Sequence, residues 1–328
     1  MSSRLVFTGK QVVRYETFDA PEPGAGSVAV QTLCSLMSTG TEGIVFERRF
    51  DPGTHWDRWV RYPFYPGYAS IARVTGAPAG SHLAVGQRVA LRAPHASHHV
   101  VREDECVPVP DGIDDRSASW FALAKIAFMG ARAAQYAIGD SVAIIGAGPI
   151  GQMSVRWASA LGARTIVSID TVDSRLELAK RGGATTTIAK PIRDAIAHLA
   201  GCADGDRPRV VIDGTGHAEV FGAALEAVRD QGRVVVLGDT GSPAKQALSS
   251  HVILRGLTIV GAHDGLRDAH WSPDRICRYF FELALSKRFD LSGLVTHVFD
   301  PKDCEKAYGT ASSRRGETMG ILFDWSAT

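Results

Sequence analysis

A glycine-rich turn is the strongest chemical signal in the sequence. The motif Gly146-Ala-Gly-Pro-Ile-Gly151 directly follows an apolar strand at 141–145 and opens a helix with apolar residues at helical spacing. In such a turn Gly146 makes the tight bend, Gly148 lets backbone approach a pyrophosphate, and Gly151 packs the helix on the strand. The helix N-terminus adds free N–H groups and partial positive charge for phosphates. The motif therefore predicts a dinucleotide site.

An acidic residue at the end of the next strand completes this pattern. Asp170 ends the run Ile166-Val-Ser-Ile-Asp170 and follows Gly151 by about 20 residues, the expected spacing. Its carboxylate would accept hydrogen bonds from ribose hydroxyls and repel a 2′-phosphate. NAD(H) is therefore the favoured cofactor, with NADP(H) as the alternative. Arg175 could stack on the adenine or be a solvated helix charge.

Two later strands also end in small residues, as ligand-binding edges of parallel sheets do. They end at Asp213-Gly-Thr-Gly216 and Leu237-Gly-Asp-Thr240, sequences that also suit plain turns. The predicted cofactor-binding residues are Gly146, Gly148, Pro149, Ile150, Gly151, Asp170, Arg175, Gly214, Thr215, Leu237 and Gly238.

The elements that must position these residues fall into two domains. Up to about residue 110, short alternating strands broken by Gly and Pro predict a small antiparallel barrel. From about residue 114, apolar strands alternate with helices, which predicts an α/β fold with a doubly wound parallel Rossmann sheet. Asp114 and Asp115 should cap a long helix that continues through Ala134. The five predicted parallel strands are Ser141 to Ile145, Arg164 to Ile169, Val210 to Asp213, Arg233 to Leu237 and Leu257 to Gly261.

Short strands return after a helix at 274–289, so we expect the tail to rejoin the barrel. The expected organisation is a catalytic barrel-like domain at 1–118, a dinucleotide-binding domain at 119–288 and a C-terminal return at 289–328. The chemistry would then lie in the cleft between the domains.

Bulk composition excludes several classes of protein. The chain has 328 residues, 45% of them hydrophobic, and a formal net charge of +1, so we expect no nucleic-acid partner. No apolar run approaches the ~20 residues that span a bilayer, and the first residues contain no signal core, so we expect no membrane partner and a cytoplasmic location. Five scattered cysteines without a C-x-x-C pair predict free thiols.

These features together resemble the medium-chain dehydrogenase/reductase family, which has the fold of zinc alcohol dehydrogenases. The resemblance covers essentially the whole chain and rests on the order of the domains and on the stretches 66–74, 139–151, 163–170 and 295–299. It implies a chaperonin-10-like (GroES-like) β-barrel catalytic domain and hydride transfer with a nicotinamide cofactor. It also implies a small-molecule substrate and a homodimer joined through the Rossmann sheets.

The family's zinc ligands are missing from the chain. The resemblance places Ser38, Tyr68 and Phe121 where the family has its three ligands, and these leave no set of donors for tetrahedral Zn²⁺. His98 and His99 should point to opposite faces of a strand. Of His95, His98 and His99, at most two could therefore share a metal. We therefore expect no metal, as in a zinc-free branch of the family.

Without a Lewis acid, side chains must protonate or polarise the substrate oxygen. Lys125, in the apolar run Phe121-Ala-Leu-Ala-Lys125, is the first catalytic candidate, since burying a lysine is costly unless it is paired or functional; it could also be a snorkelling lysine. Tyr68 could direct its hydroxyl at the substrate or simply pack. Glu42 could accept from Lys125 or from substrate hydroxyls, or cap a helix.

Two further segments are candidate substrate edges. The Arg- and Trp-rich segment 48–61 could form a wall suited to a polar, ring-shaped molecule, or be a surface excursion, and His263-Asp264-Gly265 is a second candidate edge. The sequence thus predicts a zinc-independent, NAD(H)-dependent oxidoreductase that interconverts an alcohol and a ketone on a polar small molecule such as a sugar, a cyclitol or a biosynthetic intermediate. The alternatives are an NADPH-dependent quinone or enoyl reductase, which Asp170 disfavours, and a dinucleotide-binding protein without turnover.

Overall fold

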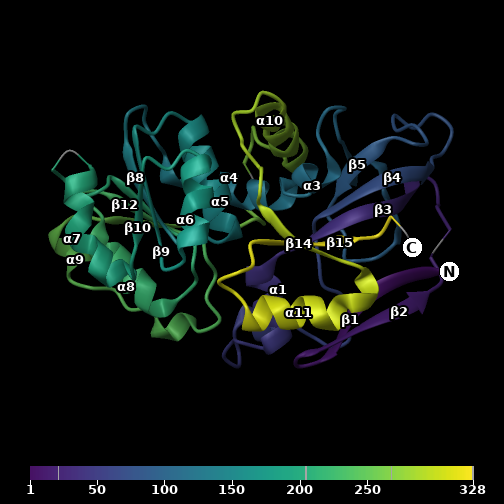
Figure 1. Cartoon of the computed structure of the whole chain (residues 1–328), viewed down its shortest axis with the longest axis horizontal. Coiled ribbons are helices and arrows are strands. Elements are labelled where there is room, and N and C mark those ends of the chain that lie inside the picture. The colour runs from purple at the N-terminus through teal and green to yellow at the C-terminus, as the bar shows by residue number, and fades with distance from the viewer. Residues whose placement is uncertain (21, 204, 267, 327–328) are drawn as a thin grey trace.

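The computed structural model describes residues 1–20, 22–203, 205–266 and 268–326, which form two units along the long axis (Figure 1). One unit is built on a parallel sheet whose strand order is β10-β9-β8-β11-β12-β13. This order starts at the centre and winds outward in both directions, which confirms the predicted doubly wound Rossmann sheet. Its strands are β8 (Ser141–Ile145), β9 (Thr165–Asp170), β10 (Thr186–Ala189), β11 (Val210–Asp213), β12 (Arg233–Val236) and β13 (Thr258–Gly261).

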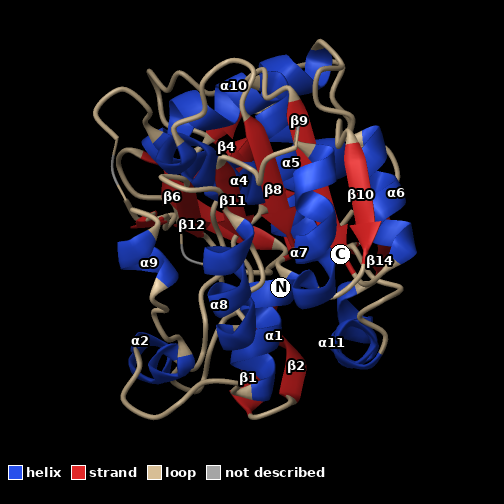
Figure 2. Ribbon diagram, turned by 90° about the vertical axis from the view of Figure 1, so that its left-hand side faces the viewer, coloured by secondary structure: helices blue, strands red, loops and turns tan. Residues whose placement is uncertain are grey.

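Alternate side chains of β8 show how helices cover both faces of this sheet. Val142 and Ile144 pack in one buried cluster with α4, α5 and α6, whereas Ala143 and Ile145 pack in another with α7 and α8. Because neighbouring residues of a strand point to opposite faces, a strand covered on both sides must be apolar throughout. Figure 2 shows these helices around the strands. They are α4 (Phe121–Ala134), α5 (Pro149–Ala160), α6 (Asp173–Arg181), α7 (Ile192–Cys202) and α8 (Ala218–Ala227).

The other unit is a mostly antiparallel sheet, in agreement with the predicted barrel domain. Its strand order is β14-β15-β3-β4-β5-β7, with β6 paired to β3, and β1 and β2 form a separate hairpin. The strands are β1 (Ser2–Gly9), β2 (Val12–Phe18), β3 (Ser27–Met37), β4 (Ser70–Gly76), β5 (Arg88–Leu91), β6 (His98–Arg102), β7 (Val107–Pro108), β14 (Val295–Phe299) and β15 (Gly320–Asp324). The C-terminal strands thus join the sheet of the N-terminal residues, and both chain ends lie in this unit (Figure 1).

The remaining helices connect the two units or lie at their edges. No helix among the described residues is long and apolar enough to cross a membrane. The helices outside the Rossmann layers are α1 (Thr39–Glu47), α2 (His55–Trp59), α3 (Asp115–Ala118), α9 (His251–Leu254), α10 (Pro273–Leu285) and α11 (Cys304–Ser313).

One local prediction was wrong, and one strand was missed. The expected long helix after residue 114 is split into α3 and α4, although Asp114 does cap α3 by accepting from the Ser117 N–H. At the break, the Ser119 hydroxyl donates to the Arg116 carbonyl, and such local side-chain bonds compete with a continuous helix. Strand β10 was not predicted, because Thr186-Thr-Ile-Ala189 is short and only partly apolar.

Candidate functional site

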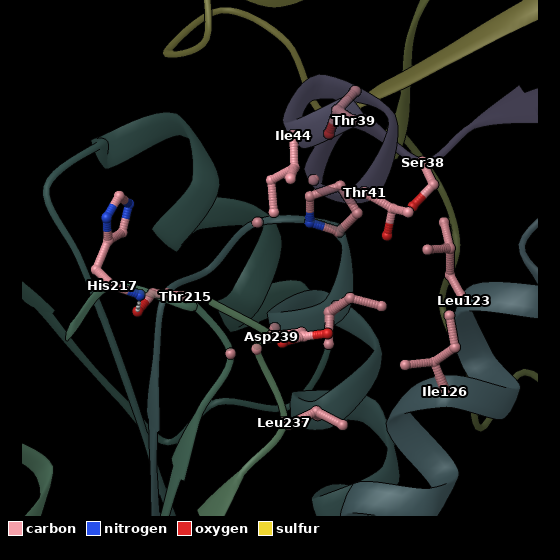
Figure 3. A pocket seen from close by; sticks show the side chains of 18 of the residues that line it. Ser38, Thr39, Thr41, Ile44, Leu123, Ile126, Thr215, His217, Leu237 and Asp239 are labelled. Atoms are coloured by element: carbon pink, nitrogen blue, oxygen red, sulfur yellow. Dashed lines mark hydrogen bonds between the residues drawn. The ribbon is translucent and has the colours of Figure 1, made fainter. Parts of the chain in front are cut away.

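A cavity of about 1180 Å³ lies between the two units at the carboxyl ends of the parallel strands. The Rossmann unit contributes the glycine motif and the ends of β9, β11 and β12, and the barrel unit contributes α1, α2 and the segment 64–68 before β4. Figure 3 shows Thr215 and Leu237 on one side and Ser38 and Thr41 on the other. Ligand pockets are typically about 300–1,000 Å³, so there is room for a dinucleotide and a substrate.

The glycine motif forms a cradle that side chains would fill. Gly146 has a φ of +88°, and a Cβ there would lie 2.7 Å from Thr215. A Cβ on Gly151 would lie 1.8 Å from the Gly146 carbonyl oxygen, so helix and turn approach too closely for any other residue. At Gly148 the one atom within 4 Å of a Cβ would be Arg175 Nη1, at 3.9 Å, and both residues line the cavity. The residues therefore fit a bound pyrophosphate at the N-terminus of α5.

Asp170 and Arg175 lie beside this cradle and line the cavity. Asp170 accepts hydrogen bonds from the N–H groups of Ala147, at 2.7 Å, and Val172, at 3.0 Å, which fix its carboxylate at the end of β9. Arg175 Nη1 lies 3.9 Å from Asp170, while Nη2 donates to the Arg315 carbonyl. Burial lowers the pKa of Arg175, and the Asp170 charge offsets part of this shift. Arg175 thus ties the C-terminal segment to the cofactor cradle.

The ends of β11 and β12 close the same side of the cavity. Asp213 is fully buried and accepts from both the N–H and the hydroxyl of Thr215, which holds the turn after β11. Burial raises the pKa of Asp213, and these hydrogen bonds offset part of the shift. A Cβ on Gly238 would lie 2.3 Å from the Gly216 nitrogen, so the two turns need glycine to approach each other. All eleven residues predicted to bind the cofactor line this cavity, and their roles remain predictions.

The residues at the three family zinc positions do not fit the metal. Ser38 and Tyr68 line the cavity, and the Tyr68 hydroxyl donates to Ser38 Oγ. Phe121 is buried in the hydrophobic core instead. Two neutral hydroxyls and a phenyl ring do not supply the thiolate, imidazole or carboxylate ligands that Zn²⁺ needs. Within the described ranges, no group of three or more His, Cys, Asp or Glu side chains is arranged to hold a metal.

The Tyr68 hydroxyl is part of a small polar cluster on the cavity wall. Besides its bond to Ser38, it interacts with the Thr41 hydroxyl, and the Arg92 guanidinium lies 4.8 Å from the centre of its ring. Burial raises the pKa of Tyr68, while these hydroxyls and the Arg92 charge offset part of the shift. The phenol is therefore neutral near pH 7 and carries a proton that it can donate.

Lys125 does not line the cavity among the described residues, but it is connected to this cluster. Its ammonium lies 2.6 Å from Asp264 Oδ1 and donates to the Asp264 carbonyl oxygen at 2.8 Å. Asp264 Oδ2 in turn lies 2.5 Å from Arg92 Nη1, and Arg92 stacks on Tyr68. Lys125 and Asp264 belong to the Rossmann unit and Arg92 to the barrel unit, so this chain of charges joins the two across the cavity.

Glu42 lines the cavity, but its carboxylate is occupied by the barrel domain rather than by Lys125. It accepts from the Ser38 N–H at 2.7 Å and from the Tyr308 hydroxyl, and it lies 3.1 Å from His95 Nε2. Burial and the Glu42 charge raise the pKa of Tyr308 well above its ordinary value. His95 also contacts Ser35 Oγ, at 2.7 Å. This buried network fixes the start of α1, which carries Ser38.

Several residues of the site were not singled out by sequence reasoning. Arg92 and Tyr308 lack any local motif, and their roles arise from contacts with residues distant in the chain. Asp264 was predicted only as part of a substrate edge, and its pairing with Lys125 spans 139 residues. Because a buried lysine is costly without a counter-ion, an acidic partner for Lys125 could have been predicted, although the sequence does not say which residue it is.

Comparison with known proteins supports this arrangement. A family model described as zinc-binding dehydrogenase matches residues 149–273. The L-threonine 3-dehydrogenase of Burkholderia vietnamiensis (strain G4 / LMG 22486) is 36% identical over 194 residues, which cover 58% of this chain and 53% of that protein. The L-threonine 3-dehydrogenase of Paraburkholderia phytofirmans (strain DSM 17436 / LMG 22146 / PsJN) is 34% identical over 194 residues, 58% of this chain and 52% of that protein. The chain thus spans about half the length of the curated relatives it matches.

Solved structures extend the likeness of the fold over both domains. Benzyl alcohol dehydrogenase from Acinetobacter calcoaceticus superposes with a TM-score of 0.85 at 20% identity, over 98% of this chain and 99% of that one. Galactitol-1-phosphate dehydrogenase from Escherichia coli gives a TM-score of 0.82 at 18% identity, with the same coverage. These structures show that the chain has the two-domain fold of these dehydrogenases, and the matches to the family model and to the threonine dehydrogenases fall on the part of the chain that carries the glycine cradle.

Proposed function

We propose that the protein is a zinc-independent, NAD(H)-dependent oxidoreductase that interconverts an alcohol and a ketone on a polar small molecule. One observation carries the proposal: a single cavity is lined by all the predicted cofactor-binding residues and by a cluster of hydroxyl groups beside a chain of ion pairs. Sugars, cyclitols and biosynthetic intermediates are the substrate types we favour.

In this proposal the Rossmann unit binds the cofactor. The N–H groups at the start of α5 and the open space at Gly148 would hold the pyrophosphate, and Asp170 would accept from the adenosine ribose hydroxyls. The fixed carboxylate supports NAD(H) over NADP(H), because a 2′-phosphate would meet a like charge. When bound, the nicotinamide supplies or accepts the hydride.

The barrel unit would handle the proton. Tyr68 donates to Ser38, whose own hydroxyl proton is then free to bond a substrate oxygen in the cavity. During ketone reduction, Ser38 would pass its proton to the substrate oxygen and take the Tyr68 proton in its place. Burial keeps the phenol protonated near pH 7, so its proton is present when the substrate binds. The Arg92 charge would stabilise the phenolate that remains after the transfer, until solvent returns a proton to it.

The chain of Lys125, Asp264 and Arg92 would supply electrostatic stabilisation. Two cations and one carboxylate leave one net positive charge, and Arg92 brings it against the Tyr68 ring. A fixed positive charge near a developing oxyanion lowers its energy, as a metal ion otherwise would. Direct proton donation by Lys125 is the other prediction, and its pairing with Asp264 favours the indirect role.

We also propose that the protein works as a homodimer through the edge of the Rossmann sheet. Strand β13 ends this sheet, and no described strand pairs with its outer edge. Leu248, Ile253, Leu254 and Leu266 near this edge are 55–84% exposed, which is unusual for large apolar side chains unless a partner covers them. A second copy related by a twofold axis would present the same edge and continue the sheet.

Cofactor titration and turnover assays test the proposal. We expect NADH to quench protein fluorescence at lower concentration than NADPH, and NADH oxidation at 340 nm with at least one carbonyl from a panel of cyclic and open-chain ketones. Cofactor binding with no hydride transfer to any carbonyl would instead support a dinucleotide-binding protein without turnover.

A further inference from the structure

Aromatic rings line the barrel side of the cavity. We call these rings the aromatic wall, and they come from α2 and the segment that follows it: Trp56, Trp59, Phe64 and Tyr65. Trp59 lies 5.7 Å from Trp56 and 5.1 Å from Phe64, measured between ring centres. Trp59 is 52% exposed and Tyr65 is 38% exposed, although both line the cavity. The wall therefore offers ring surface to a ligand rather than only to the core.

The wall is fixed from behind. Trp56 is only 4% exposed and packs in the core of the barrel unit, where it anchors α2. The Arg4 guanidinium lies 4.4 Å from the centre of the Tyr65 ring and holds it in place. His55 Nε2 also lies 2.8 Å from Asp239 Oδ2, so α2 is tied to the Rossmann unit. A wall held in this way is pre-organised, and binding to it costs little ordering.

Apolar side chains of two helices also line this end of the cavity, beside the polar residues around Ser38. Ile44 of α1 and Leu123 and Ile126 of α4 line it, and Figure 3 shows these side chains around the same space as Ser38 and Thr41. The aromatic wall continues directly into Gly67-Tyr68, so it leads to the Tyr68–Ser38 hydroxyl pair. A ligand here meets apolar surfaces along its body and hydroxyl groups at one end.

We propose that the substrate carries its alcohol or ketone on an alicyclic ring, and that one face of this ring packs on the aromatic wall. The inference rests on the proposed function and narrows its substrate class. Aromatic side chains bury a large apolar area against the face of a ring, and a ring loses less conformational freedom on binding than an open chain of the same size. The alcohol or ketone oxygen attached to the ring then lies toward Tyr68 and Ser38.

Matched pairs of ligands test the proposal. The pairs are cyclohexanone against 2-hexanone, and myo-inositol against sorbitol, so that each pair compares a ring with an open chain of equal carbon number. Calorimetry measures binding of the ketones to the protein with NAD⁺ and of the polyols to the protein with NADH, because these combinations cannot react. The values of kcat and KM are measured in parallel with the reactive cofactor. We expect the ring to bind about tenfold more tightly in at least one pair. Whether the preference is found with cyclohexanone or with myo-inositol then tells whether the site favours an apolar or a hydroxylated ring.

Variants of Trp59 connect the preference to the wall. Trp59→Ala should abolish the ring preference by raising KM and Kd for the ring compound, with kcat and the Kd for NADH nearly unchanged. Trp59→Phe keeps a ring and should retain most of the preference. Val85→Ala, at an exposed position that is not among the residues lining the cavity, should leave the preference and the kinetics unchanged. Equal binding of ring and open chain in both pairs overturns the proposal. If NADH binds and no compound is turned over, the proposed function fails, while the calorimetric comparison still decides for or against the ring site.

Discussion

Removal of the Tyr68 hydroxyl should be the most informative single change in the active site. Tyr68→Phe keeps the ring under Arg92 but removes the proton that would replace the one Ser38 passes to the substrate, so kcat for ketone reduction should fall. Loss of a positioned acid costs about 10²–10⁴-fold in rate, or roughly 3–5 kcal/mol of transition-state stabilisation. The Kd for NADH should change by less than about twofold, because the glycine cradle lies on the other unit.

Stopped-flow measurement of NADH oxidation separates this effect from binding. Lys125→Met is the matched comparison, since it removes the ammonium from Asp264 without touching the cavity wall. If lysine acts only through Asp264 and Arg92, this variant should lose less activity than Tyr68→Phe, and Lys125→Arg should recover part of the loss. The reasoning is refuted if Tyr68→Phe retains most of its activity while Lys125→Met does not, because the lysine would then be the donor.

Three other predictions follow from single contacts. Asp170→Asn should weaken the preference for NADH over NADPH by removing a like-charge contact of about 1–3 kcal/mol; an unchanged ratio of Kd values would contradict the role of the carboxylate. Burial lowers the pKa of His99 to about 4. Because the unfolded chain takes up this proton first as the pH falls below about 6.5, the free energy of unfolding should decrease between about pH 6.5 and 4, by about 3 kcal/mol at most. His99→Gln should flatten the pH dependence of urea unfolding in that window, and an equally steep curve would count against it. Ile253→Lys with Leu254→Lys should shift a dimer toward monomer in sedimentation, whereas an unchanged sedimentation coefficient would exclude this edge.

The fold class was predictable because its signals are local. Nearly continuous apolar strands such as β8 indicate a sheet covered on both faces, and the glycine motif fixes where its first helix begins. Local signals fail where one side chain competes for the backbone, as Ser119 does between α3 and α4. They also fail for the short edge strand β10, where burial on the second face is incomplete.

The cofactor half of the site was more accessible to sequence reasoning than the catalytic half. Carboxyl ends of parallel strands meet at one edge, so Asp170, Thr215 and Leu237 converge once the topology is known. The partners of Lys125 and Glu42 depend on contacts that span 139 and 266 residues, which no local pattern encodes. The sequence identified both as catalytic candidates, but not the residues that they contact.

Transfer of label from deuterated cofactor in the presence of a metal chelator tests the central claim most directly. The protein, dialysed against EDTA and checked for zinc by elemental analysis, would be incubated with NADH deuterated at nicotinamide C4 and a cyclic ketone. Mass spectrometry of the product alcohol should show deuterium on the carbinol carbon. The labelled product should form at the same rate with and without chelator, and elemental analysis should find zinc far below one atom per chain. Product formation that stops with chelator and returns with added Zn²⁺ would contradict a reaction carried by Tyr68, Ser38 and Arg92.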